Sequence, residues 1–125
     1  MLDDAYGNLV GTMSVEARDA YNLGVSRFLG AELGVSDAFQ TALRADEGFA
    51  LAHVGLARDM QLRGQPERVR TSLGQARALA LGLGERERSH INASALLLEG
   101  KAAAARVAVY EHVESWPADV MIAQM

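Results

Sequence analysis

Apolar residues recur along the chain at the three- and four-residue spacing of amphipathic helices, and short clusters of glycine, proline and acidic residues interrupt them. No run of alternating β-branched and polar residues and no Asn-Gly or Asp-Gly turn indicates a strand or a hairpin. The predicted helices cover about residues 14–30, 36–45, 49–63, 66–81, 85–100 and 101–114, and a seventh is predicted to begin at Pro117. The chain is therefore predicted to be all-α.

Capping residues set the ends of these helices. Ser14 is a suitable N-cap, and Glu16 follows in the first turn, where the helix dipole favours a carboxylate. Gly64 can adopt the left-handed conformation that ends a helix. Pro66 and Pro117 each suit a first helical position, because that position needs no amide donor.

The second helices of the three predicted hairpins repeat at intervals of 34 and 36 residues, which place Phe39, Leu73 and Val109 in register. We expect these three residues to be buried between hairpins. Two mid-helix glycines, Gly24 and Gly55, each follow an apolar residue, and a helical glycine of this kind indicates close approach of the partner helix. The pattern predicts an N-terminal segment, residues 1–13, and a solenoid of hairpins at about 14–46, 48–82 and 85–115.

The period, the Leu23-Gly24 and Val54-Gly55 pairs and "AFQTALRAD" resemble the tetratricopeptide repeat family. "DAYGN", "DEGFALAH", "RERSHINASALLLEG" and "WPADVMIAQ" together resemble the N-terminal part of the tetratricopeptide repeat protein 38 family. Members of that family are longer, so the resemblance implies a fragment or a truncated relative. It implies a helical repeat fold and no specific activity or cofactor. The first hairpin departs from the usual family pattern, because Glu47 stands where a proline is common.

Composition narrows the classes of function. The formal charge is −4, from 12 Lys and Arg against 16 Asp and Glu, and the basic residues are dispersed, which disfavours nucleic-acid binding. The chain has no cysteine, so a disulfide or a thiolate metal site is excluded. The first ten residues do not resemble a signal peptide, and no apolar run is long enough to span a bilayer. We expect a cytoplasmic protein that binds neither nucleic acid nor membrane.

The stretch "GERERSHINASALLLEG" contains charged residues and a histidine, which are the residue types most often found in catalytic sites. Glu85 and Glu87 fall in the first turn of a helix, where carboxylates are stabilised, so the charges have a structural explanation. His90 aligns with Leu23 and Val54, which predicts a packed, hydrogen-bonded histidine. The histidines lack the spacing of a zinc site, and no nucleophile elbow or phosphate loop occurs. We therefore predict no catalytic residue, no metal site and no cofactor.

The first helices of the hairpins are expected to line a concave groove. The mixture of aromatic, aliphatic and charged residues on this predicted stripe suits an extended peptide or a partner helix. The candidate ligand-binding residues are Arg18, Tyr21, Asp59, Arg88 and Asn92. The sequence thus predicts a non-catalytic scaffold for a protein or peptide partner. Two alternatives stay open: a helical subdomain of a larger enzyme whose active site lies elsewhere, and a sensor or oligomerisation arm of a regulator.

The predicted seventh helix carries Val120, Met121, Ile122 and Met125 and has no mate to cover them. An exposed apolar end of this kind would favour a homodimer through Trp116–Met125. The alternative is that the terminal helix folds back onto the sixth helix.

Overall fold

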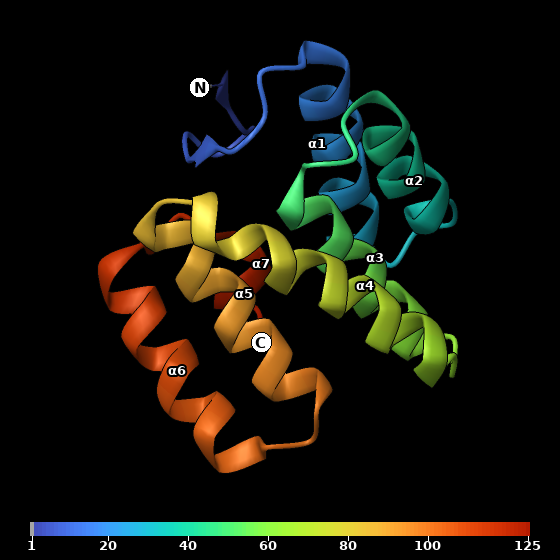
Figure 1. Cartoon of the computed structure of the whole chain (residues 1–125). Helices are drawn as coiled ribbons and strands as arrows, with labels where there is room; N and C mark the ends of the chain where they lie inside the picture. Colours follow the sequence, from blue (N-terminus) through green and yellow to red (C-terminus); the bar gives the residue numbers. More distant parts are fainter. Residues whose placement is uncertain (1) are drawn as a thin grey trace.

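The computed structural model describes residues 2–125, which form seven α-helices, one short 3₁₀ turn and one small sheet. The helices α1 to α4 span Val15–Leu29, Val35–Ala45, Ala50–Leu62 and Pro66–Leu79, and the 3₁₀ turn spans Ala80–Gly82. The helices α5 to α7 span Glu85–Leu98, Ala102–Ser115 and Val120–Ala123. The pairs α1 and α2, α3 and α4, and α5 and α6 pack most closely, and the α3 and α4 pair lies between the other two (Figure 1). The prediction of a helical protein is confirmed.

The capping residues act largely as predicted. The Ser14 side chain accepts a hydrogen bond from the Ala17 amide at 3.1 Å, and Pro66 is the first residue of α4. Gly64 has a left-handed backbone with φ of 69°, directly after the end of α3. Pro117 does not begin a helix, because it lies in a turn and α7 begins three residues later, at Val120.

The two short strands were not expected. β1 (Leu2–Asp3) and β2 (Leu9–Val10) pair antiparallel, with Leu2 opposite Val10. Gly7 turns the chain between them with φ of 84°, and Asp4 Oδ1 accepts the amide of Asn8 at 3.0 Å. Strands of two residues are too short to show an alternating pattern, which is why the sequence did not reveal them.

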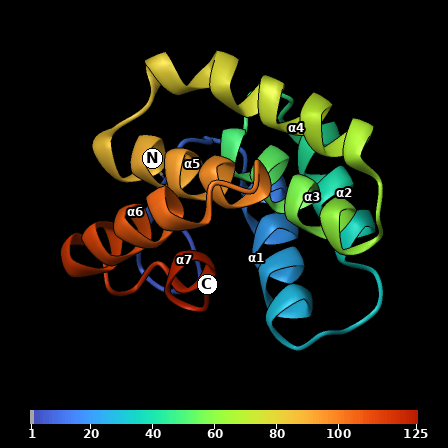
Figure 2. The same ribbon diagram turned by 90° about the horizontal axis from the view of Figure 1, so that it is seen from below.

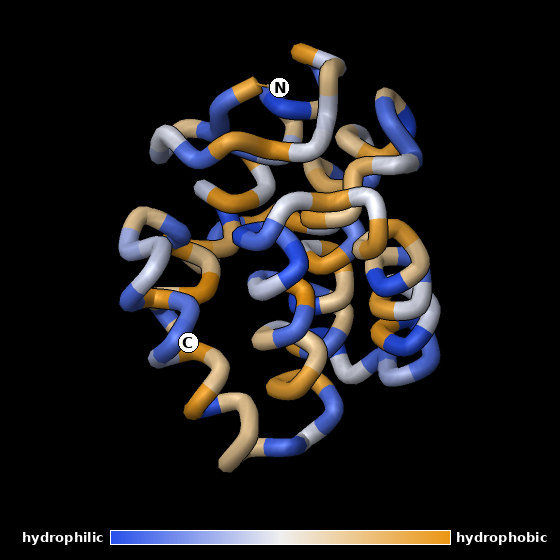
Figure 3. Tube along the Cα trace, turned by 60° about the vertical axis from the view of Figure 1, so that its left-hand side comes forward, coloured by the Kyte–Doolittle hydropathy of each residue, from blue (hydrophilic) through white to orange (hydrophobic). Residues whose placement is uncertain are grey.

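The main core surrounds Phe39, a residue of α2. Its side chain is completely buried and packs against α1 and α3. Added Cβ atoms at Gly24 and Gly55 would lie 2.7 Å and 2.5 Å from atoms of the Phe39 ring. The two glycines therefore allow α1 and α3 to approach the ring from two sides. Close packing at both mid-helix glycines is confirmed, and at Gly24 the paired helix α2 provides it. At Gly55 the contact comes from α2 of the preceding hairpin and not from the paired helix α4. Hydrophobic positions recur along each helix between hydrophilic ones (Figure 3).

We expect Gly55→Ala to lower the free energy of unfolding by about 1–3 kcal/mol, because the new methyl group overlaps a buried ring. This loss should exceed the gain of about 1 kcal/mol that alanine brings in helix propensity. Gly74→Ala is the matched control, because a Cβ on Gly74 meets no atom within 4 Å. Urea denaturation of both variants tests the packing, and a Gly55→Ala protein as stable as the parent would contradict it.

Only part of the burial that the repeat register predicts is found in the structure. Phe39 and Leu73 are buried, as predicted. Val109 is only partly buried, so the prediction is wrong at this position. On α6 only Ala105 and His112 are buried, because the four-residue α7 covers much less of α6 than α3 covers of α2.

The prediction of an exposed apolar end is wrong. Met121 and Ile122 are buried at 2% and 0% exposure. After the turn at Pro117 the chain folds back, so that α7 packs against α5 and α6 (Figure 2). The guanidinium of Arg58, on α3, donates a hydrogen bond to the backbone oxygen of Met121. Two of the side chains invoked for a two-fold contact are thus covered within the chain itself, whereas Val120 and Met125 are only partly buried. A homodimer through Trp116–Met125 stays a prediction.

No helix among residues 2–125 combines the length and the apolar character that crossing a membrane requires.

Candidate functional site

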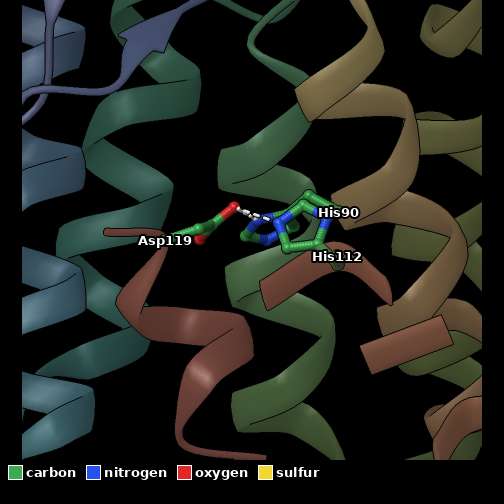
Figure 4. Close-up of side chains that lie close together, drawn as sticks. All are labelled: His90, His112 and Asp119. Atoms are coloured by element: carbon green, nitrogen blue, oxygen red, sulfur yellow. Dashed lines mark hydrogen bonds and ion pairs between the residues drawn. The ribbon is translucent and has the colours of Figure 1, made fainter. Parts of the chain in front are cut away.

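A buried polar cluster joins α5, α6 and the start of α7. Asp119 lies directly before α7, and its Oδ2 atom accepts three hydrogen bonds at 2.8 Å, from Arg86 Nη1, His90 Nδ1 and His112 Nε2. Figure 4 shows both imidazoles directed at this carboxylate. Each of the two histidines is 1% exposed, and Asp119 is 3% exposed. We call these four residues the Asp119 network.

The hydrogen bonds to Asp119 indicate which nitrogen of each imidazole carries a hydrogen. An ionised carboxylate only accepts, so His90 Nδ1 and His112 Nε2 must each carry the hydrogen that they donate. The other nitrogen of His112, Nδ1, lies 2.7 Å from Ser89 Oγ, and in a neutral imidazole it accepts the serine hydroxyl. Trp116 packs on the same ring, with 5.0 Å between the ring centroids. The ring of His112 is therefore held on every side that can hydrogen-bond.

Burial and charge act in opposite directions on these groups. Burial alone would raise the pKa of Asp119, but His90, His112 and Arg86 outweigh it and hold the pKa well below its usual range. Burial lowers the pKa of His90, and Asp119 only partly offsets this effect. Asp119 is thus ionised at neutral pH, and His90 is neutral.

The residue types in the network could supply a metal ligand set. One ligand atom each from His90, His112 and Asp119 lies within 4.8 Å of the other two. Both imidazole hydrogens, however, point at the same carboxylate oxygen, and 2.8 Å is shorter than the separation of about 3.3 Å between ligands of tetrahedral zinc. Arg86 holds the same oxygen with a full positive charge. This arrangement is that of a closed ion-pair network, whose members face one another rather than a common cation position.

The network also fastens distant parts of the chain together. Arg86 Nη2 donates to the backbone oxygen of Leu9 at 2.8 Å, which ties the β1–β2 hairpin to α5. Asn8 Nδ2 donates to the backbone oxygen of Ala118 at 3.0 Å. The two ends of the described chain therefore meet around Asp119. The physical role that this geometry supports is to hold the terminal segment in place.

A second candidate site is a cleft in a different part of the molecule, between α4, the end of α3 and the end of α5. Its volume is about 650 Å³. Val69, Leu73 and Leu98 form an apolar part of its lining, and Arg70, Arg77 and Glu99 are the charged residues. Arg77 binds Glu99 through two parallel hydrogen bonds of 2.9 Å and 2.8 Å. We call this space the α4–α5 cleft.

The cleft exists because α4 and α5 pack much less closely than α2 and α3. Between the first and second hairpins, Ser36 on α2 donates a hydrogen bond to Asp59 on α3 and ties the two helices together. The repeat register places Arg70 at the position of Ser36, and Arg70 is exposed, with no hydrogen-bonded or ionic partner within residues 2–125. The corresponding tie between α4 and α5 is therefore missing.

The five residues predicted to line a concave groove do not share one open surface. Tyr21 and Asp59 are buried, at 4% and 6% exposure. Tyr21 packs on Phe49 with 4.9 Å between ring centroids, and Asp59 pairs with Arg63 Nε at 3.0 Å. Arg18 is half-buried and bonds the backbone oxygen of Asp3, whereas Arg88 and Asn92 are exposed. Tyr21 and Asp59 thus contribute to the core, and a role for the other three in binding remains a prediction.

Sequence reasoning predicted a packed, hydrogen-bonded His90, which is confirmed. It missed the partners of His90, because Asp119 and His112 are 29 and 22 residues away in the chain and the spacing is not that of any motif. The available signal was the repeat: His90 and His112 occupy helix positions where the other hairpins have Val54 and Ala42. Two polar residues at paired core positions indicate a buried polar pair.

Comparisons of the chain with family models, with curated proteins and with solved structures give no match.

Proposed function

We propose that this chain is a non-catalytic protein-interaction module built from tetratricopeptide-like helical hairpins, and that it binds its partner in the α4–α5 cleft. The first helices, α1, α3 and α5, contact one another in chain order, which supports a solenoid arrangement. The cleft is the observation that carries the proposal. Its volume of about 650 Å³ lies in the usual range of ligand pockets, and its lining combines apolar and charged groups.

A role as the catalytic part of an enzyme has less support. The Asp119 network holds the residue types of an acid–base site, yet its atoms are buried and already paired with one another. A general base must reach the proton that it removes from a substrate. Residues that are 1–3% exposed offer a substrate no such approach.

Filling the cleft should abolish partner binding without unfolding the protein. Gly74 lines the cleft, and a side chain added there enters open space, so Gly74→Leu should occupy the cleft and also favour the helix. A photo-cross-linking amino acid at Gln61, on the cleft wall, reports what binds there in a lysate of the source cells. We expect the parent to form a discrete cross-linked product that Gly74→Leu loses.

Gly82→Leu is the matched control, because Gly82 also has open space around it and does not line the cleft. This variant should cross-link as the parent does. Equal products from all three proteins, or no product from the parent, would contradict the proposal.

A further inference from the structure

We infer that the α4–α5 cleft takes a short, extended, acidic segment of the partner protein, with a carboxylate bound at Arg70 and an aliphatic side chain against Leu73 and Leu98. This inference rests on the proposed interaction function and identifies the chemical class of the partner.

The charge of the lining selects for acidic groups. The whole chain carries a formal charge of −4, but the cleft is lined by two arginines and a single carboxylate. Glu99 already neutralises Arg77. Arg70 lies seven residues before Arg77 on the same face of α4 and has no ionic partner among residues 2–125. A guanidinium binds a carboxylate through two parallel hydrogen bonds, as the Arg77–Glu99 pair within the cleft already demonstrates.

The size of the cleft selects an extended segment over a helix. A ten-residue helix is about 15 Å long and about 10 Å across, so it fills on the order of 1200 Å³. The cleft of about 650 Å³ can enclose only a few residues, and a segment that short does not form a stable helix on its own. Gln61 and Gln65 also line the cleft, and their amides can donate to and accept from a peptide backbone. An extended segment leaves its backbone groups free for these bonds, whereas a helix uses them internally.

The apolar part of the lining receives the side chains that alternate with the acidic ones. Val69, Leu73 and Leu98 adjoin the arginines along the cleft. In an extended chain successive side chains point in opposite directions. A segment that alternates acidic and aliphatic residues can therefore direct its carboxylates to Arg70 while its aliphatic groups cover Leu73 and Leu98.

Fluorescence anisotropy with a labelled hexapeptide that alternates glutamate and leucine tests this inference on the full chain. We expect saturable binding to the parent, at least tenfold weaker binding of a peptide with glutamine in place of glutamate, and no binding of a lysine peptide. Arg70→Gln should weaken binding of the acidic peptide about tenfold, whereas Arg44→Gln, an exposed arginine of α2 outside the cleft, should not change it. Gly74→Leu should abolish binding.

Glu99→Gln gives a test in the opposite direction. This change releases Arg77 from its pair, so affinity for the acidic peptide should rise severalfold. Equal binding of the acidic and neutral peptides, or equal losses in Arg70→Gln and Arg44→Gln, would overturn the acidic class. If Gly74→Leu still loses the cross-linked partner in that case, the interaction function stands and only the chemistry of the segment is wrong. If the cross-link is also unaffected, both proposals fail.

Discussion

Phe39→Ala is expected to lower the free energy of unfolding by about 3–5 kcal/mol, the range for removing a fully buried aromatic side chain. The ring fills the space between Gly24 and Gly55, and neither glycine has a side chain that could move into the cavity. The surrounding helices would have to collapse to compensate, and they are held apart by the rest of the core. Urea denaturation at constant pH measures this loss.

A double-mutant cycle tests whether the Phe39 ring contacts Gly55. Gly55→Ala should be costly in the parent and nearly harmless in Phe39→Leu, because the smaller leucine leaves space for the added methyl group. Additive effects of the two changes would mean that Phe39 and Gly55 are not in the contact that the structure places between them. The exposed Leu33 serves as a control, since Leu33→Ala should leave the unfolding midpoint almost unchanged.

The local parts of the fold were predictable because local physics determines them. The Ser14 cap, the Pro66 start and the mid-helix glycines each depend on a few neighbouring residues or on the repeat register. The path of the chain after Ser115 was not predictable in this way. It depends on whether Pro117 turns the chain and on partners that lie far away in sequence, such as Arg58 and Arg86.

The candidate site residues were likewise predictable only as far as local patterns determine them. A helical face predicts which residues point together, but it does not show which of them the next hairpin covers. Tyr21 and Asp59 belong to one predicted stripe with Arg88 and Asn92, and packing buries only the first two. Glu87 is a similar case, because its first-turn position indicated only a carboxylate favoured by the helix dipole, whereas the segment at Gly11, directly after β2, covers it. Burial raises the pKa of Glu87, which no local pattern could have indicated.

One sequence difference between the repeats explains the α4–α5 cleft, but its meaning is clear only from the structure. Position 36 is a serine that ties α2 to α3, and the register places an arginine, Arg70, at the corresponding position of α4. A long charged side chain cannot replace a short buried tie. The helices α4 and α5 therefore separate at this position and leave the space in which we place the partner.

Asp119→Ala is expected to cost about 3–5 kcal/mol at pH 7, because it leaves the buried His90 and His112 and the partly buried Arg86 without their common acceptor. Asp19→Ala is the control, since Asp19 forms an exposed pair with Arg18 and should contribute little. The loss should be accompanied by release of the terminal segment, which amide hydrogen exchange of α7 can measure. Unchanged protection of Met121 and Ile122 in the variant would contradict the role of Asp119 as the attachment of α7.

The dependence of this loss on pH follows from the direction of the pKa shift. The pKa of Asp119 is lower in the folded protein than in the unfolded chain, so the unfolded chain binds more protons as the pH falls. The stability that Asp119 contributes is therefore complete above its ordinary pKa, about pH 4, and is lost as the pH falls below that value. The lowered pKa of His90 acts in the same direction at higher pH, because the unfolded chain takes up its proton below about pH 6.5 while the buried ring resists it. Denaturation of the parent and Asp119→Ala between pH 3 and pH 7 should show that the difference between the two stabilities begins to narrow below about pH 4. A difference that stays constant down to pH 3 would mean that the carboxylate is not the group that the network stabilises.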